Sequence, residues 1–207
     1  MIETDKKREL IIDGAVKRFI HFGIHKTTMN EIAEDLSVSK PSLYYYFPDK
    51  SSLILGVVEK IFNDYFEVLS RDQTKGDTLE DTLINIIEIR HRFFMRYYML
   101  HLSRGNSDPA LNATELKTFI LKMKEKENKF YEGIFEEAIS KNEILPLKDI
   151  AKITDLYISS MSGLTSLCVM HGNKELFPDK KELKVMKEKQ ISLSKIFING
   201  LKNQHPA

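Results

Sequence analysis

The sequence predicts an all-α protein. Among its 207 residues are only 9 glycines and 6 prolines, and the stretches between them repeat apolar residues at helical intervals rather than alternating them as strands do. The hydrophobic content of 42% and the charged content of 29% are ordinary for a globular chain,. We therefore expect a small N-terminal three-helix unit followed by a larger helical C-terminal domain.

The first helix is expected over about residues 5–22, with Gly23 as its C-terminal cap,. One face of this helix would carry Ile11, Ala15, Phe19 and Phe22. Thr28 and Glu31 have the spacing of a capping box, in which each side chain accepts a hydrogen bond from the other residue's backbone amide,. The box predicts a second helix that ends near Leu36.

Two further helices follow. Ser39 precedes a short third helix that directs Leu43 and Phe47 inward, and Asp49 can cap a fourth helix over about residues 50–69,. The fourth helix carries two adjacent apolar stripes, namely Leu53, Val57, Ile61, Tyr65 and Ile54, Val58, Phe62, Phe66. A surface helix needs one stripe, so this helix is expected to lie between two bodies. We therefore place the domain boundary at its start and divide the chain into residues 1–50 and 51–207.

The remainder is expected to form helices over about residues 78–95, 97–103, 109–141, 149–171 and 179–201,. The last two suggest a homodimer interface of two helices from each chain. The first of them has a surface of small residues, namely Ser159, Ser160, Ser162, Gly163, Thr165 and Ser166. It also carries the apolar residues Leu156, Met161, Leu164 and Leu167. The second repeats Leu183, Met186, Leu193, Phe197 and Leu201 at heptad-like spacing,. The alternative is that both helices close their own domain.

Residues 28–47 have the order helix, short turn, helix, with the small Ala33 at the helix crossing and Val38 filling the turn. This is the order of a helix-turn-helix, whose second helix presents base-contacting side chains to the DNA major groove. That helix offers one cation, several hydroxyls and no acid, in Lys40, Pro41, Ser42, Tyr44, Tyr45 and Tyr46. Three consecutive tyrosines cannot all face a core, because successive helical residues lie about 100° apart. The pattern predicts a DNA-binding surface.

The stretch from Thr27 to Lys50 closely resembles the TetR family of bacterial transcription regulators. The resemblance implies a homodimer whose N-terminal helices bind double-stranded operator DNA and whose C-terminal domain dimerises and often holds a small effector. Carried over by position, it implies base contacts from Lys40, Pro41, Ser42 and Tyr44, and contacts to the DNA backbone from Thr28, Tyr45, Tyr46 and Lys50. Ser39 completes the candidate DNA-binding set.

Two positions depart from the family pattern. Ser37 stands where the turn usually has glycine, so we expect a left-handed backbone that serine tolerates less readily,. Pro41 stands where many relatives have glycine, and a contact to a thymine methyl is expected of it,. Residues 1–56 contain eight Lys and Arg against eight Asp and Glu, so phosphate binding must depend on a local patch. The acid-free run of cations is Lys17, Arg18, His21, His25 and Lys26, and the acids Glu31, Glu34 and Asp35 of the supporting helix are expected to face away from DNA.

A small apolar or aromatic effector could contact Phe62, Phe66, Phe94, Tyr98, His101 and Phe130, although aromatic residues at helical spacing more often form plain core,. No metal site or cofactor is expected, since His91 and His171 lack partners at metal-ligand spacing,. An enzyme is not expected either, because no nucleophile, base and orienting acid are grouped. The single cysteine and the lack of a signal peptide or membrane span favour a cytoplasmic protein,.

The interpretation favoured by these patterns is a ligand-responsive repressor that binds a pseudo-palindromic operator as a dimer. Its two recognition helices would enter successive major grooves about 34 to 36 Å apart. The alternative is a DNA-binding repressor or activator that is controlled by a protein partner or by no small molecule.

Overall fold

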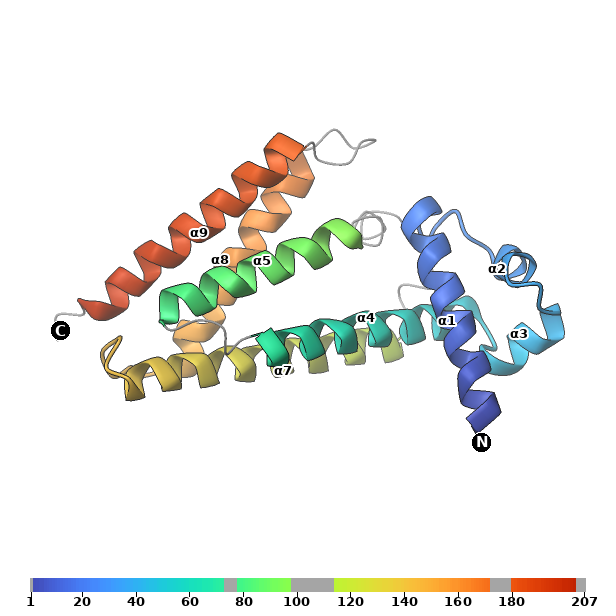
Figure 1. Cartoon of the computed structure of the whole chain (residues 1–207), viewed down its shortest axis with the longest axis horizontal. Helices are drawn as coiled ribbons and strands as arrows, with labels where there is room; N and C mark the ends of the chain where they lie inside the picture. Colours follow the sequence, from blue (N-terminus) through green and yellow to red (C-terminus); the bar gives the residue numbers. More distant parts are fainter. Residues whose placement is uncertain (1, 73–77, 98–113, 172–179, 204–207) are drawn as a thin grey trace. The chain divides into compact units, whose positions relative to one another are not determined.

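The computed structural model describes residues 2–72, 78–97, 114–171 and 180–203 of the chain (Figure 1). Every element in these ranges is an α-helix, which confirms the predicted fold class. The helices are α1 (Ile2–Phe22), α2 (Met29–Asp35), α3 (Lys40–Tyr46), α4 (Lys50–Asp72), α5 (Leu79–Arg96), α7 (Thr114–Ser140), α8 (Ile150–His171) and α9 (Lys180–Lys202). Nearly all of the short helix expected over 97–103 lies outside the described residues, as does the expected start of the long helix at residue 109.

The helices form two compact units. The first unit comprises Met1–Glu67 and Phe93–Met123, and the second comprises Val68–Arg92 and Lys124–Ala207. The first unit therefore contains α1, α2, α3 and most of α4. The second contains most of α5 and α7 together with α8 and α9.

The core of the first unit is built from side chains that α1 to α4 bury almost completely. Its central members are Ile11, Ala15, Phe19, Ile32, Ala33, Leu43, Phe47, Leu53, Ile54 and Val57. The helices α1 and α2 approach closely at Gly14, where an added Cβ would lie 2.6 Å from Leu36 Cδ2. Phe22 was expected on the buried face of α1, but it is 54% exposed. Its ring lies under the Arg18 guanidinium, with 5.0 Å between the ring centroid and Arg18 Cζ.

Local signals set most of the helix ends. Gly23 has a φ of 78° and its amide donates to Phe19 O at 2.9 Å, as expected of a C-terminal cap,. The Asp49 carboxylate accepts from Ser52 N at 2.7 Å and begins α4,. The helix α4 continues to Asp72, beyond the expected end near residue 69, and α1 begins at Ile2 rather than near residue 5.

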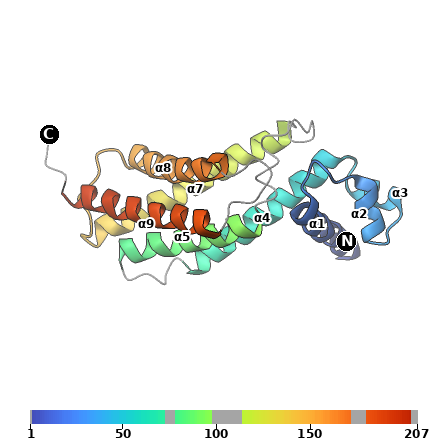
Figure 2. The same cartoon turned by 90° about the horizontal axis from the view of Figure 1, so that it is seen from above.

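The second unit has an aromatic and polar interior. Tyr157 of α8 lies against the rings of Tyr131 and Phe135 of α7 and of Phe197 of α9. The hydroxyl of Tyr157 and Ser194 Oγ lie 2.8 Å apart, and Ser194 Oγ donates to Gln190 O at 3.0 Å. The helices α8 and α9 run side by side in both Figure 1 and Figure 2.

The faces predicted for α8 and α9 are partly wrong. Leu183, Met186 and Leu201 are buried within their own unit, as is Met161 of α8. The heptad-like series of α9 therefore faces inward, because a helix that closes its own unit turns its most regular apolar stripe toward that core. Leu156 and Leu167 of the predicted set are exposed, and the other exposed apolar side chains of the two helices are Val185 and Ile196.

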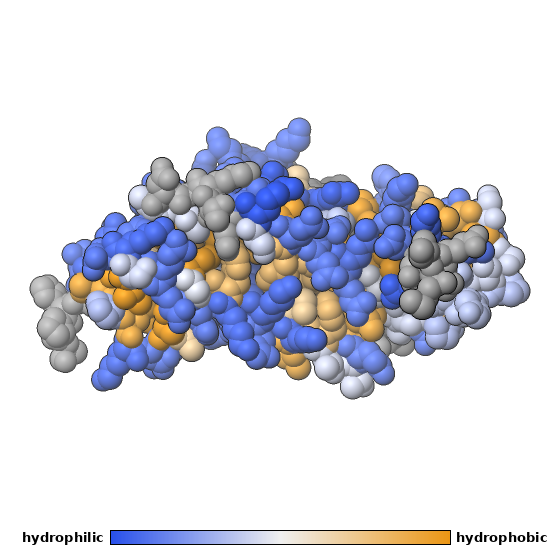
Figure 3. Space-filling view, turned by 60° about the horizontal axis from the view of Figure 1, so that its bottom comes forward, coloured by the Kyte–Doolittle hydropathy of each residue, from blue (hydrophilic) through white to orange (hydrophobic). Residues whose placement is uncertain are grey.

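Among the described residues, no helix has both the length and the apolar character that a membrane crossing requires. On the face shown in Figure 3, hydrophilic side chains cover much of the surface and apolar ones form separate patches.

Candidate DNA-binding site

The capping box predicted for α2 is present. Glu31 N donates to Thr28 Oγ1 at 3.3 Å, and Thr28 N donates to Glu31 Oε2 at 2.8 Å. Thr28 Oγ1 also donates to Glu31 Oε2 at 2.8 Å, so Glu31 engages both hydrogen-bond donors of Thr28. A phosphate contact from Thr28 would therefore require Glu31 to release one of them.

The turn between α2 and α3 is closed by backbone hydrogen bonds. Ser37 N donates to Glu34 O and Val38 N donates to Ala33 O, both at 3.0 Å. Ser37 has a φ of 53°, which confirms the left-handed conformation expected at this position. Val38 is half-buried and packs against the core, as expected of the residue that fills the turn.

The helix α3 is fixed by its two ends and by one buried side. Ser39 caps it by accepting from Ser42 N at 3.3 Å. Leu43 and Phe47 are buried, as predicted, and Pro41 lies in the first turn, where its missing amide hydrogen is not needed,. With this side of α3 buried and its first turn capped, the other side of the helix faces outward.

The residues predicted to contact DNA from α3 lie on its outward face. Lys40 and Pro41 are exposed, and Ser42 and Tyr46 are half-buried. The side chains of Tyr44 and Tyr45 are 44% and 78% exposed. The rings of Tyr45 and Tyr46 meet edge to face at 5.2 Å. No acid occurs on this helix. The face can therefore donate hydrogen bonds to bases and phosphates without like-charge repulsion.

The cationic run before α2 differs from the expectation at one residue. Lys17, His21, His25 and Lys26 are exposed, but Arg18 is turned toward α2 and its side chain is only 15% exposed. Its guanidinium forms ion pairs with acids of the supporting helix, described below. The expected phosphate-binding patch is thus corrected to the four exposed members of the run.

Arg18 binds two carboxylates of α2. Arg18 Nη2 lies 2.8 Å from Glu31 Oε1, and Arg18 Nη1 lies 2.6 Å from Asp35 Oδ2. The hydrogen bond to Asp35 raises the pKa of Arg18 above its ordinary value. The hydrogen bonds from Thr28 and the charge of Arg18 lower the pKa of Glu31. Sequence reasoning missed this contact, although Glu31 and Asp35 lie four residues apart and therefore share one face of α2.

Lys50 is the first residue of α4 and is half-buried. It follows Asp49, whose carboxylate caps the helix. The N-terminus of this 23-residue helix carries a partial positive charge from the aligned peptide dipoles,. Lys50 therefore lies where an anion is favoured.

The predicted effector residues are divided between the two units. Phe62 meets Phe119 edge to face at 5.9 Å, and Phe66 and Phe94 are buried in the same first unit. Phe130 belongs to the second unit, where it lies 5.8 Å from Tyr131. The remaining two candidates, Tyr98 and His101, lie outside the described residues.

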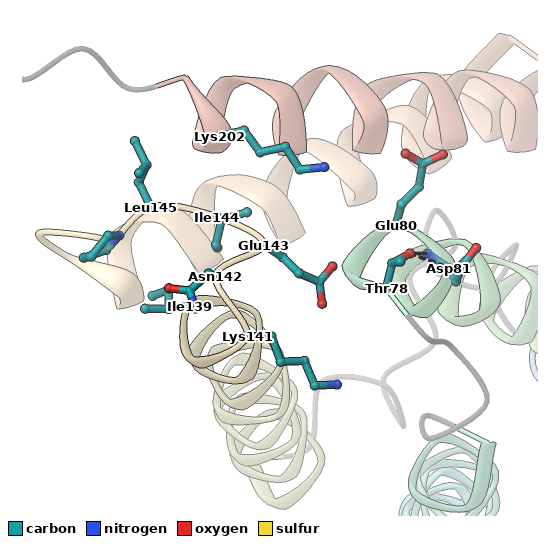
Figure 4. A pocket seen from close by; sticks show the side chains of 11 residues that line it. Thr78, Glu80, Asp81, Ile139, Lys141, Asn142, Glu143, Ile144, Leu145 and Lys202 are labelled. Carbon is teal, nitrogen blue, oxygen red and sulfur yellow. Dashed lines mark hydrogen bonds between the residues drawn. The ribbon is translucent and has the colours of Figure 1, made fainter.

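A hollow of about 840 Å³ opens in the second unit and is lined by other residues (Figure 4). Lys141, Glu143 and Lys202 point into it from one side, and Glu80 and Asp81 face them. A smaller hollow of about 330 Å³ lies along α8 and α9, beside Leu164, Val185, Leu193 and Ile196. Within the part of the chain that the structure describes, no three His, Cys, Asp or Glu side chains gather as a metal site would require.

Comparison with known proteins agrees with this geometry. Residues 11–57 match the tetR family of bacterial regulatory proteins. The chain is 26% identical over 106 residues to IcaR of Staphylococcus epidermidis, the negative transcriptional regulator of the biofilm operon icaADBC. That match spans 51% of this chain and 57% of IcaR. Matches to other curated regulators span only 25% and 27% of their length, so the chain covers at most little more than half of these relatives.

Solved structures match over nearly the whole chain. A transcriptional regulator from Cytophaga hutchinsonii superposes with a TM-score of 0.82 and 26% identity, over 95% of this chain and 99% of that one. FadR from Bacillus subtilis, solved in complex with stearoyl-CoA, has the same fold with a TM-score of 0.68 and 19% identity, over 95% and 99% of the two chains. The matched segment 11–57 contains the capping box, the left-handed turn and the capped helix α3 described above. Residues 11–57 of the chain are thus similar to the tetR family of bacterial regulatory proteins, and the fold of the chain is that of solved transcriptional regulators.

Proposed function

We propose that the chain is a transcriptional regulator that binds operator DNA through α3 and represses the gene beside that operator. The observation that carries this proposal is the outward face of α3, which is exposed, rich in hydroxyls and free of acids. A solvated helix without such a task would be expected to mix in acids. Repression is favoured because the relative IcaR is a negative regulator.

Each residue of the candidate set has a role in this proposal. Lys40 and Ser42 donate hydrogen bonds to base edges, Tyr44 contacts a base with its exposed ring, and Pro41 contacts a thymine methyl,. The hydroxyls of Tyr45 and Tyr46 and the ammonium of Lys50 hold the phosphate backbone, together with Thr28,. Ser39 acts indirectly by capping the helix that carries them.

The operator would be pseudo-palindromic, because two copies of the chain would read two half-sites about 34 to 36 Å apart. We place the DNA-reading part at residues 1–50 and the dimerisation and effector part at 51–207. The dimer would form through the outward sides of α8 and α9, whose exposed apolar residues are Leu156, Leu167, Val185 and Ile196. Burial of such side chains between copies stabilises an isologous interface.

A small apolar or aromatic effector would release the repressor from DNA. A solved protein of the same fold holds stearoyl-CoA, so the fold can accommodate an apolar ligand. The coupling that such a switch needs is about 1 to 3 kcal/mol. The second candidate is a regulator without a small-molecule effector, and it is favoured by the burial of Phe66 and Phe94 in the core of the first unit. Operator release during titration with apolar and aromatic compounds separates the two candidates.

The central test is to purify the full chain from its own cells and sequence the genomic DNA that it retains. We expect a small set of sites that share an inverted repeat, each next to a promoter. Duplexes of these sites should bind the purified chain more tightly than a scrambled duplex of the same length and composition. Retention of unrelated sequences, or equal affinity for both duplexes, would contradict sequence-specific binding.

A matched pair of variants connects this binding to α3. Lys40→Ala removes a base contact and should weaken operator binding by about 1 to 3 kcal/mol, which is about five- to 150-fold. Lys117→Ala removes an equally charged, exposed side chain from α7 and should leave binding within about twofold. Equal effects of both substitutions would refute the assignment of α3.

A further inference from the structure

Arg18 lies in the cationic run before α2 but is directed away from solvent. Its two terminal nitrogens lie 2.8 Å from Glu31 and 2.6 Å from Asp35. Its Cζ lies 5.0 Å from the centroid of the Phe22 ring, a cation-π distance,. Its Nε is buried and has no hydrogen-bond partner. The side chain is therefore fixed between α1 and α2 and is not extended toward a ligand in solution.

One of the two carboxylates that Arg18 holds, Glu31, contacts the candidate DNA-binding residue Thr28. Glu31 Oε2 accepts from both Thr28 N and Thr28 Oγ1 at 2.8 Å, so its charge is in contact with a residue expected at the phosphate backbone. Asp35 is one turn further along the same face and is half exposed at 50%. Without a counter-charge, both carboxylates would repel the approaching phosphates.

We propose that Arg18 is a positioning residue for DNA binding, which neutralises Glu31 and holds Asp35 so that DNA meets a supporting helix of reduced negative charge. The inference rests on the proposed function. Arg18 itself makes no contact with DNA in this proposal. Its effect passes through the two acids, and it fixes where α2 lies on α1.

The role can be isolated because the acids can be neutralised without breaking the fold. Glu31→Gln keeps the capping box, since glutamine serves at this position as well as glutamate. Asp35→Asn keeps the shape of the side chain. Arg18→Met keeps the apolar stem of arginine and its packing on Phe22 while removing the charge.

The experiment measures the affinity of full-length variants for the operator duplex recovered from genomic DNA, by fluorescence anisotropy. The salt concentration is about 100 mM, at which charges still interact over about 10 Å. We expect Arg18→Met to weaken binding about three- to tenfold, because the charges of two carboxylates on the supporting helix are then no longer balanced and act on the phosphates through space. The triple variant Arg18→Met/Glu31→Gln/Asp35→Asn should recover the wild-type affinity to within about twofold. The double variant Glu31→Gln/Asp35→Asn, which retains Arg18, should bind at least as tightly as wild type.

A matched control removes the same charge elsewhere in the first unit. Lys60→Met breaks the ion pair between Lys60 and Asp13, whose atoms lie 3.4 Å apart, and should leave affinity within about twofold. Thermal melts of all variants report folding separately from binding. A double variant that binds more weakly than wild type overturns the proposal even if Arg18→Met does not fold.

Three further outcomes would overturn the proposed role of Arg18. The proposal is overturned if Arg18→Met binds like wild type, if the triple variant stays as weak as the single one, or if Lys60→Met is equally weak. The second of these results would mean that Arg18 acts by touching DNA or by packing alone. Failure of the wild-type chain to prefer its operator refutes the proposed function, whereas a normal wild-type curve with an unaffected Arg18→Met variant refutes this inference alone.

Discussion

Replacing Ser37 with glycine should stabilise the chain. Ser37 has a φ of 53°, and the surrounding turn is fixed by hydrogen bonds from Ser37 N to Glu34 O and from Val38 N to Ala33 O. A residue with a Cβ in this conformation costs about 1 to 2 kcal/mol, because the Cβ crowds the following carbonyl oxygen. Glycine removes the crowding and can keep both hydrogen bonds.

An opposing effect reduces the gain. Glycine gives the unfolded chain more freedom, which costs about 0.4 to 1 kcal/mol. The central values leave a net stabilisation of about 0.8 kcal/mol, which corresponds to about 2 to 3 °C in melting temperature for a chain of this size.

Urea unfolding of the full chain, followed by circular dichroism, measures this difference. Ser37→Ala is the matched control, because alanine removes the hydroxyl but retains the Cβ. We expect a higher midpoint for Ser37→Gly and an unchanged midpoint for Ser37→Ala. A gain of equal size in both variants, or none in Ser37→Gly, would refute backbone crowding as the source of strain.

Further predictions concern packing, a buried hydroxyl and the DNA backbone. Gly14→Ala should lower the free energy of unfolding by about 1 to 3 kcal/mol in a thermal melt, because its Cβ would lie 2.6 Å from Leu36 Cδ2. Tyr157→Phe should cost about 1 to 2 kcal/mol in the same assay through the lost 2.8 Å hydrogen bond with Ser194,. Burial raises the pKa of the Tyr157 hydroxyl. The stability that its neutral form contributes is therefore present below about pH 10 and is lost as the pH rises toward the pKa of the folded state. A pH series of melts that stays level above about pH 10 would contradict this. Lys50→Ala should weaken binding to all duplexes alike and reduce the slope of log affinity against log salt by about one, and an unchanged slope would remove Lys50 from the phosphate contacts.

Interactions between residues close in the sequence could be predicted. The capping box of Thr28 and Glu31 and the cap of α3 by Ser39 each join residues three apart. The left-handed Ser37 was expected from the departure from glycine in the family pattern. Such contacts depend on the spacing along one helix end and little on the rest of the fold.

Contacts between helices were harder to predict. The sequence places Arg18 in an acid-free run, but its two partners lie on another helix and become neighbours only when α1 and α2 pack. Likewise, the apolar spacing of α9 identifies a buried face without indicating whether its own unit or a second chain covers it. The burial of Leu183 and Met186 within the unit answers that question. The grouping of the aromatic candidates depends on the same long-range packing, which is why Phe130 falls in a different unit from Phe66.

The buried hydrogen bonds between α8 and α9 have a consequence for the alignment of the two helices. Tyr157 pairs with Ser194, and Gln190 Nε2 donates to Met161 O at 3.2 Å and to Thr165 Oγ1 at 3.0 Å. A slide of one helix along the other by a single turn, about 5.4 Å, would leave these polar groups unpaired in an apolar interior. Apolar contacts alone would tolerate such a slide far better, since one leucine can replace another. The polar pairs therefore permit a single alignment of α8 with α9. Any partner that docks on the outer side of the two helices meets one fixed pattern of side chains.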